Sequence, residues 1–512
     1  MEITIIGWLV IALTIYGFFK SEDFLLYLGI FFSTFTATSI INIDKTVTGI
    51  APFYFIISFW ILKVIINYIR SKKYLNKEII ANIMKKNKLI KSLAIFGVII
   101  IIGELYMFIS GKTIIVNNQL NNEVLKLTFS GSNITQPIYL LFMLVFAIFL
   151  SLKINSKEKI RNVLKIFFIS TIFALIWGVM QFCMFYLGIE YPAYLFNNNI
   201  ALAQLHFQMV YGIKRVNSIA LEPSTFALNV LGILPIIMIL WLSNLKIFKN
   251  NLKSNLIFVL IILLTLICGI LTTSSTAYIG IALTILFITI YVLVFSIKDN
   301  ALRKNRKRLL LFYVIAIIST ILVIILAVNI FNIYWGTLVD MLKDMTINKI
   351  NLESGHERSN AVNMSFTIFR QSPLVGIGWG SFRSLDTFTN LLANTGLLGV
   401  ISYFYIIFIT LKSAFLNRRK NEVISIALIL SVVIMTISLL ISIPDLVFGY
   451  YWMMIALTYN YCTNSKEGDN NENSNWWKAI NREENRYWIL FRIFTWEYIR
   501  KWQRKWILYI FR

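Results

Sequence analysis

Residues 255–272 read NLIFVLIILLTLICGILT and carry no charged side chain. A helix needs about 20 mostly apolar residues to cross the roughly 30 Å hydrocarbon core of a bilayer, so this run has the length of a membrane span. About thirteen such runs follow one another: 3–19, 24–41, 50–69, 92–110, 137–152, 164–188, 219–242, 255–272, 276–297, 309–329, 388–411, 423–443 and 446–462. They lack the alternating faces of a membrane β-barrel. The sequence therefore predicts an all-α polytopic membrane protein with about 12–13 transmembrane helices, the first run being the weakest.

The composition excludes a soluble enzyme. Of the 512 residues, 58% are hydrophobic and only 14% are charged, and the mean hydropathy is +0.73. A soluble domain has about a quarter of its residues charged, so this chain has too little polar surface to cover a globule. The net charge of +24 would suggest a nucleic-acid partner in a soluble protein. In a membrane chain this charge first has to be located.

Basic residues are concentrated in alternate connections between the runs. One set of connections holds 27 Lys or Arg in 67 residues: 20–23, 70–91, 153–165, 246–253, 298–308 and 412–420. The opposite set holds ten in about twice that length. Because Lys and Arg mark cytoplasmic loops, we expect a multi-pass protein of the cytoplasmic (inner or plasma) membrane with its N-terminus outside and its C-terminus inside. The positive charge then follows from topology, and no nucleic acid is expected as a partner.

The chain is expected to form a membrane domain over residues 1–462 and a cytoplasmic tail over residues 463–512. The tail begins with the polar stretch SKEGDNNENSN and holds six of the 13 tryptophans among basic residues. Trp beside Lys and Arg is typical of a helix in the headgroup layer, although an unselected C-terminus is the alternative. No phosphate-binding GxxxxGK[ST] loop and no metal-ligand spacing occurs in the sequence, so we expect no cofactor and no metal.

Four arginines contradict the charge rule by lying in outer connections. They are Arg215, before the seventh run, and Arg358, Arg370 and Arg383, in a long extracytoplasmic loop over residues 330–388. Arginine grips phosphate through two parallel hydrogen bonds, so these residues predict an anionic, phosphate-bearing ligand on the outer side. The alternative is that they contact lipid headgroups or pair with Glu353, Glu357 and Asp386.

The long outer loop is itself patterned. Residues 357–373 read ERSNAVNMSFTIFRQSP, which places apolar side chains at helical spacing and ends at a proline. This pattern predicts an amphipathic helix at the outer interface, with Arg358 one turn before its apolar stripe. The following VGIGWGSF, residues 375–382, predicts a turn-rich loop because no strand and helix frame its glycines.

Several titratable side chains are candidates for proton transfer. His206 and His356 lie in the two arginine-bearing loops, and imidazole is the usual proton acceptor near neutral pH, although a lone histidine is more often structural. Glu222 heads the seventh run, where it can complement the helix dipole, orient Arg215 or accept a hydroxyl proton. Glu104 is an acid inside an apolar run, which marks a functional site unless the residue reaches water.

At these residues the sequence resembles a known family. SGHERSNAVNMSFTIFRQSPLVGIGWGSF, followed by TFTNLLANTGLLGVISYF, is similar to the signature region of the O-antigen ligase and polysaccharide polymerase superfamily, Wzy-type polymerases among them. In that region an SG-x-x-R segment opens an outer helix, a P-L-x-G-x-G turn follows, and a helix beginning H-N-x-x-L runs into G-L-L-G. The segment from Arg215 to Pro223 and the stretch SSTAYIGIALTI also resemble family patterns. The resemblance covers about residues 200–460.

The resemblance implies a membrane glycosyltransferase whose donor is a saccharide on undecaprenyl diphosphate at the outer leaflet. An acceptor hydroxyl attacks the anomeric carbon, the lipid diphosphate leaves, and no nucleotide sugar or obligatory metal takes part. By the motif match, Arg358 and Arg215 bind the diphosphate, and the outer position of Arg370 and Arg383 adds them to the candidate set. The expected partners are the lipid-linked oligosaccharide and membrane lipids, with a chain-length regulator and a flippase as further candidates.

One departure from the family pattern concerns the proton acceptor. The family's ligases place a histidine where this chain has Thr389, and threonine cannot serve as a base. Catalysis then depends on diphosphate stabilisation by Arg358, or Glu222 or His356 takes the proton. The missing histidine favours a polymerase of O-antigen or capsular repeat units over a ligase that transfers glycan to another acceptor. A transporter or flippase of lipid-linked saccharides is the alternative from another class, and it would place polar residues in many spans.

Overall fold

The computed structural model describes residues 1–43, 48–70, 87–121, 123–154, 156–200, 206–210, 212–243, 251–295, 305–331, 336, 339–340, 343–344, 353–417 and 422–463. Most of the expected outer loop before Glu353 lies outside the described residues. So does the expected tail from residue 464 onwards.

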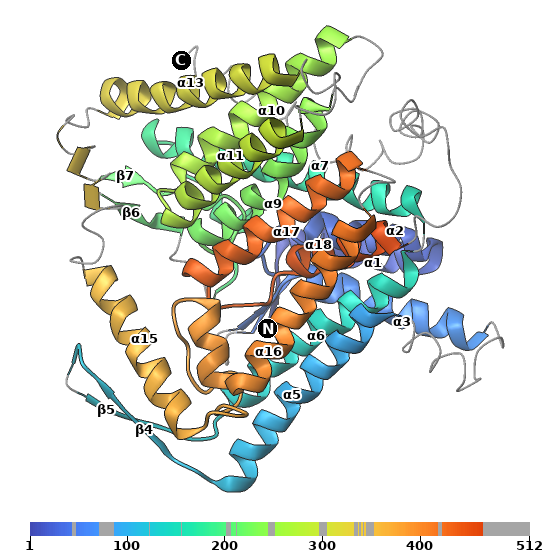
Figure 1. The fold of residues 1–512 in the computed structure, drawn as a ribbon, viewed down its shortest axis with the longest axis vertical. Coiled ribbons are helices and arrows are strands. Elements are labelled where there is room, and N and C mark those ends of the chain that lie inside the picture. Colours follow the sequence, from blue (N-terminus) through green and yellow to red (C-terminus); the bar gives the residue numbers. More distant parts are fainter. Residues whose placement is uncertain are drawn as a thin grey trace.

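Long helices follow the order of the predicted apolar runs (Figure 1). They are α1 (Ile5–Lys20), α2 (Glu22–Phe32), α3 (Pro52–Arg70), α5 (Lys88–Ser110), α6 (Ser132–Lys153), α7 (Lys157–Tyr186), the short α8 (Ala193–Phe196), α9 (Pro223–Leu242), α10 (Asn251–Leu271), α11 (Ser275–Phe295), α13 (Asn305–Phe331), α15 (Glu353–Gln371), α16 (Thr387–Asn417), α17 (Glu422–Ser442) and α18 (Gly449–Thr463). Within the described residues, nine helices are long and apolar enough to cross a membrane: α3, α5, α6, α7, α9, α10, α11, α16 and α17. The predicted all-α polytopic membrane fold is confirmed.

The second predicted span, residues 24–41, ends early. Its helix α2 stops at Phe32, because the polar stretch that follows bonds to other elements instead of continuing the helix. The Thr34 hydroxyl lies 2.6 Å from that of Ser170 in α7, and the Ala37 N–H donates to the Ile219 carbonyl at 3.1 Å. Irregular backbone in a membrane protein needs such protein partners, since lipid supplies none. This segment therefore ties α2 to α7 and to the loop before α9.

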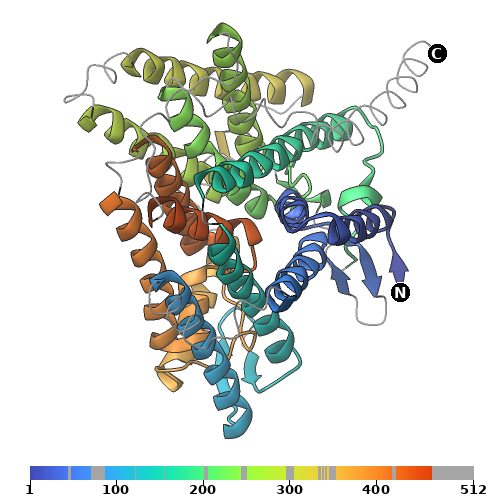
Figure 2. The same cartoon turned by 90° about the vertical axis from the view of Figure 1, so that its right-hand side faces the viewer.

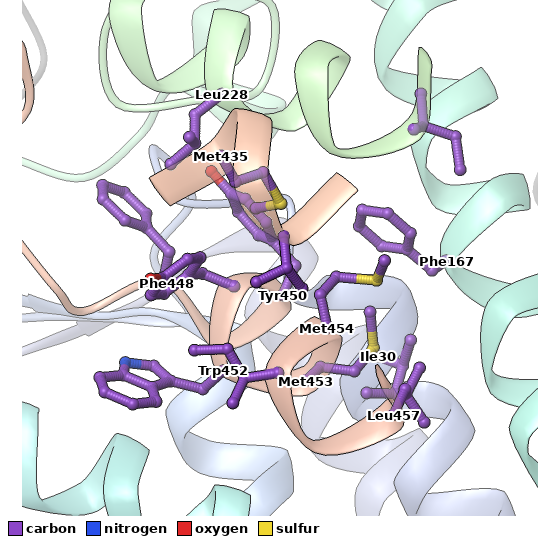
Figure 3. Packing of buried hydrophobic residues seen from close by; sticks show 14 of the residues in the cluster. Ile30, Phe167, Leu228, Met435, Phe448, Tyr450, Trp452, Met453, Met454 and Leu457 are labelled. Carbon is purple, nitrogen blue, oxygen red and sulfur yellow. The ribbon is translucent and has the colours of Figure 1, made fainter. Parts of the chain in front are cut away.

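Two helices form the centre of the bundle. Every position of α9 from Thr225 to Leu242 is buried, and so is every position of α18 from Gly449 to Tyr461. Figure 3 shows Tyr450 and Met454 of α18 among Phe167 of α7, Leu228 of α9 and Met435 of α17. The rings of Phe167 and Tyr450 stack with centroids 6.1 Å apart. The other helices surround these two, so the loops at the ends of α9 and α17 occupy a central position.

Among the residues that the structure describes, three small antiparallel sheets, which the sequence did not predict, lie outside the helices. Their strands are β1 (Glu2–Ile3), β2 (Ile41–Ile43), β3 (Thr48–Ile50), β4 (Ile114–Asn118), β5 (Glu123–Leu127), β6 (Met209–Val210) and β7 (Ile213–Lys214). In β4, Ile114 and Val116 are buried and Ile115 between them is exposed, which is the two-residue period of a strand and is too short to register as a membrane span. Figure 1 shows β4–β5, β6–β7 and α15 along one side of the bundle, with the C-terminal end of α3 on the opposite side.

Candidate active site

The predicted amphipathic helix is present as α15, which ends at Gln371, two residues before Pro373. Its buried face carries Asn360, Met364 and Ile368 at helical spacing. The Asn360 side chain donates to Asn118 Oδ1 of β4 at 2.8 Å, and Met364 and Ile368 pack in one cluster with Ile114. The β4–β5 hairpin therefore holds α15 in place on this side of the bundle.

The glycine-rich segment after α15 is the predicted turn, and it is inserted into a break in α16. Gly396 interrupts α16 with φ 60° and ψ −163°, so neighbouring backbone groups lose their helical partners. The turn replaces them: the N–H of Gly378 donates to the Asn394 carbonyl at 3.0 Å, and the N–H of Leu397 donates to the Pro373 carbonyl at 2.9 Å. The end of α15 and the start of α16 are thereby fixed relative to each other.

Glu104 of α5 positions this turn. The Asn133 amide donates to Glu104 Oε2 at 3.1 Å and to Ser381 Oγ at 2.5 Å, and the N–H of Trp379 also bonds to the Glu104 carboxylate. The acid inside the apolar run thus contacts the turn directly at Trp379 and indirectly through Asn133 of α6. The Glu104 side chain therefore holds the glycine-rich turn against α5 and α6, directly beside Gly378.

We expect Gly378→Ala to destabilise the protein by on the order of 1–3 kcal/mol. Gly378 has φ +84°, where a side chain is strained, and an added Cβ would lie 2.6 Å from Glu104 Oε2. Thermal unfolding of the purified protein in detergent measures the effect. Gly131→Ala is the matched control, because nothing lies within 4 Å of its Cβ position and its backbone is helical. Equal unfolding temperatures for the two variants would contradict this structural role of Glu104.

Arg358 projects from α15 towards the end of α17. Its Nη1 donates to the carbonyl of Ile441 at 3.2 Å, in the last turn of that helix, where a cation complements the helix dipole. Burial lowers the pKa of Arg358 below its ordinary value, and the charges of Asp386, Glu222 and Glu357 raise it again. A guanidinium has five N–H donors, and within the described residues only this one bond is recorded for Arg358. The remaining donors are available to a ligand.

Arg215 reaches the same region from the loop after β7. Its Nε donates to the carbonyl of Thr272, just after α10, and its Nη1 donates to Gln208 Oε1, both at 3.4 Å. Burial lowers the pKa of Arg215, and the charges of Glu222 and Tyr278 oppose that shift. Glu222 therefore interacts electrostatically with both Arg215 and Arg358, although these two arginines are far apart in the sequence.

Glu222 is the N-cap of α9 and is half-buried. The Thr225 hydroxyl accepts a hydrogen bond from the Glu222 N–H at 3.0 Å, which fixes the backbone at the head of the helix. Upstream, Ser218 adopts a positive φ of 54°, and its hydroxyl donates to the Ala174 carbonyl of α7 at 2.6 Å. Glu222 can therefore both complement the dipole of α9 and orient the arginines. Its carboxylate lies at the helix N-terminus, and its charge acts on both Arg215 and Arg358.

Asp386 and Thr389 occupy the start of α16. Asp386 Oδ1 accepts from the Thr389 N–H at 2.8 Å, and Asp386 Oδ2 accepts from the Thr389 hydroxyl at 2.6 Å. The Thr389 side chain is 5% exposed and is also 2.5 Å from Ser384 Oγ. At the position of the family histidine this chain therefore has a buried side chain that orients Asp386, whose charge acts on Arg358.

Three other candidate residues do not join this cluster. Arg383 forms an ion pair with Asp445 at 2.8 Å while its side chain stays 65% exposed. Arg370 is exposed in the last turn of α15, and its twelve-residue separation from Arg358 corresponds to about 18 Å along the helix axis. His356 is exposed and lies two positions before Arg358, about 200° around the helix, so it faces away from the arginine.

The loop before Arg215 contains a buried lysine that was not singled out from the sequence. Lys214 is 2% exposed, and its ammonium donates to the backbone carbonyl of His206. Burial, together with the charge of Arg215, lowers the pKa of Lys214 to about 8. His206 is also buried, with its ring 3.9 Å from that of Phe207 between centroids. The sequence signal for Lys214 was its position next to Arg215, because two adjacent basic residues are unusual in an outer loop.

The connection between α17 and α18 is the second feature that sequence reasoning missed. The carbonyl of Ile441 accepts from Arg358, and that of Ile443 accepts from the Thr387 hydroxyl at 2.5 Å. The carbonyl of Pro444 accepts from the Asn390 amide at 3.2 Å. This short segment therefore connects α15 to the start of α16. The proline that separates the last two apolar runs was its only signal in the sequence.

A comparison with protein-family models gave a match within the second half of the chain. Residues 258–404 match the family model described as O-Antigen ligase. The matched segment includes α11, α15, the glycine turn and the first half of α16, whereas Arg215 and Glu222 precede it. The resemblance inferred from the motifs is confirmed over these residues. A search of curated protein sequences gave no match.

Proposed function

We propose, because residues 258–404 match the O-antigen ligase family model, that this chain polymerises oligosaccharide repeat units carried on undecaprenyl diphosphate. The reaction takes place at the outer leaflet of the cytoplasmic membrane. The growing glycan moves from its lipid carrier to the non-reducing end of a new lipid-linked repeat unit, in the assembly of an O-antigen or a capsule.

The observation that carries the proposal is that the charge of Glu222 acts on both Arg215 and Arg358. Each arginine uses helix-end carbonyls to hold its guanidinium and retains further N–H donors within the described residues. Two fixed cations near one partly exposed carboxylate suit a reaction that releases a diphosphate and a proton together. Arg370 and Arg383 are left out of the proposed diphosphate site because Arg370 lies about 18 Å from Arg358 along α15 and Arg383 is paired with Asp445.

In the proposed reaction the acceptor hydroxyl oxygen forms a bond to the anomeric carbon of the donor glycan. The bond between that carbon and the diphosphate oxygen breaks, and its electron pair leaves on undecaprenyl diphosphate. Arg215 and Arg358 stabilise this departing charge more strongly in the transition state than in the ground state. The hydroxyl proton passes to the Glu222 carboxylate. Asp386, held by Thr389, keeps Arg358 oriented.

Purified protein in detergent, supplied with lipid-linked repeat units alone, is expected to produce a ladder of longer glycans on undecaprenyl diphosphate. Gel electrophoresis of the labelled glycans measures chain length. A ligase would extend nothing under these conditions and would need a second acceptor, while a transporter would leave the glycans unchanged because no membrane remains to cross. Absence of elongation by active protein would overturn the polymerase assignment.

A further inference from the structure

A cleft lies on the side of the bundle away from α15, on the face that the charge distribution predicts to be cytoplasmic. It is formed where α1 ends, α2 begins, α3 ends and α7 begins, and its volume is about 590 Å³. Figure 2 looks at this side of the molecule, with α1, α2 and α3 drawn in blue. The side chains that line the cleft include Phe19, Lys20, Glu22, Lys63, Arg70 and Lys159.

The acidic residues of the cleft are already paired. Glu22 accepts from Asn67 at 2.6 Å and lies 2.8 Å from the ammonium of Lys153. Asp23 lies 3.4 Å from the ammonium of Lys159. Each carboxylate therefore has a cationic partner on the neighbouring end of α6 or α7, and neither is needed to balance the remaining cations.

Three basic residues of the cleft form no ion pair within the described residues, although the charge of Glu22 acts on Lys63. Lys20 lies over the ring of Tyr16, 4.9 Å from its centroid, and Arg70 is exposed at the end of α3. Lys63 lies two turns before Arg70, so both project from the same face of α3. Three cations against no free anion give the cleft a positive potential.

Lys63 is the only charged residue between Pro52 and Ile69 of the apolar helix α3. Its ammonium donates to the carbonyls of Gly17 and Phe18 at 3.2 and 2.5 Å, at the C-terminal end of α1. A charge at this depth in a membrane helix is costly and usually marks a binding site or a pathway. Here the side chain reaches towards the cleft and adds its charge to that of Lys20 and Arg70.

We propose that this cleft binds the phosphate of an anionic phospholipid from the cytoplasmic leaflet. Basic pockets between membrane helices on that side bind phosphate-bearing headgroups, and the leaflet itself is negatively charged. Phe19, which is 81% exposed, and Ile69, which is 64% exposed, present apolar surface beside the cations, as an acyl chain requires. A lipid at this position holds the ends of α1, α2, α3 and α7 together.

The test is binding of phosphatidylglycerol to the full-length protein in neutral detergent, followed by native mass spectrometry. The double variant Lys20→Gln, Arg70→Gln is expected to bind roughly 30-fold more weakly, since each basic residue at an anionic surface contributes about fivefold. Both side chains are exposed, so unfolding temperatures without lipid should equal that of the native protein. Lys63 is left unchanged because its ammonium also bonds to the end of α1.

A second double variant, Lys88→Gln, Lys91→Gln, removes the same charge from the start of α5, outside the cleft. It should bind phosphatidylglycerol as the native protein does, and equal loss in both double variants would overturn the site. In a separate experiment, inorganic phosphate is added at millimolar concentration to the protein with and without the lipid. If phosphate alone displaces the lipid and gives the same thermal stabilisation, the cleft takes a free anion and the lipid assignment is wrong.

Discussion

Cells that carry Arg358→Ala at normal protein level should make no long polymer, and the purified variant should elongate glycans about 10²–10³-fold more slowly. Arg358 is held by the Ile441 carbonyl, and the charges of Asp386 and Glu222 act on it, so in the proposed reaction its loss removes a fixed cation from the departing diphosphate. Gel analysis of surface polysaccharide and initial rates in detergent measure the effect.

Two further variants separate charge from geometry at this position. Arg358→Lys keeps the charge but loses the planar pair of donors, so we expect intermediate activity and a raised KM for the donor. Lys126→Ala removes one positive charge from an exposed site on β5 and should leave polymer length unchanged. Long polymer in cells with Arg358→Ala would show that the assigned site is wrong.

Hydropathy predicts the fold because a bilayer demands long apolar helices, whatever packs against them. The same reasoning found α15, since its apolar side chains recur at helical spacing and Pro373 lies just beyond its end. It did not predict that α2 ends at Phe32, because hydropathy counts the small hydroxyl side chains of residues 33–39 as compatible with a span. Only their partners on α7 and α8 decide that the backbone turns there.

The site was only partly predictable. Arg215, Glu222 and Arg358 stood out because they carry charge in outer connections, but their convergence depends on how α9, α10 and α17 pack. The same signal also selected Arg370 and His356, which the turn of α15 places away from the cluster. The sequence alone could not separate the residues of the cluster from Arg370 and His356, since all of them are polar, titratable side chains in outer connections.

Glu222→Gln is expected to lower kcat by about 10²–10⁴-fold while KM for the lipid-linked donor stays equal or falls. Glutamine keeps the size of the side chain and cannot accept the hydroxyl proton. Removing a negative charge beside Arg215 and Arg358 leaves both cations free for the diphosphate, so donor binding should not weaken. Initial rates of elongation over a range of donor concentrations in detergent measure both constants.

The alternative role of Glu222 predicts the opposite division between kcat and KM. If the carboxylate only orients the arginines, its loss raises KM and leaves kcat nearly intact, because chemistry proceeds once the donor is bound. Glu222→Asp is the matched control: it keeps the charge and shortens the reach by one methylene, so it should restore part of kcat if proton transfer is the function. The half of the helix cap in which the Glu222 N–H donates to the Thr225 hydroxyl is kept in every variant, because it uses the backbone of residue 222. A higher KM with unchanged kcat in Glu222→Gln would assign the proton to another group.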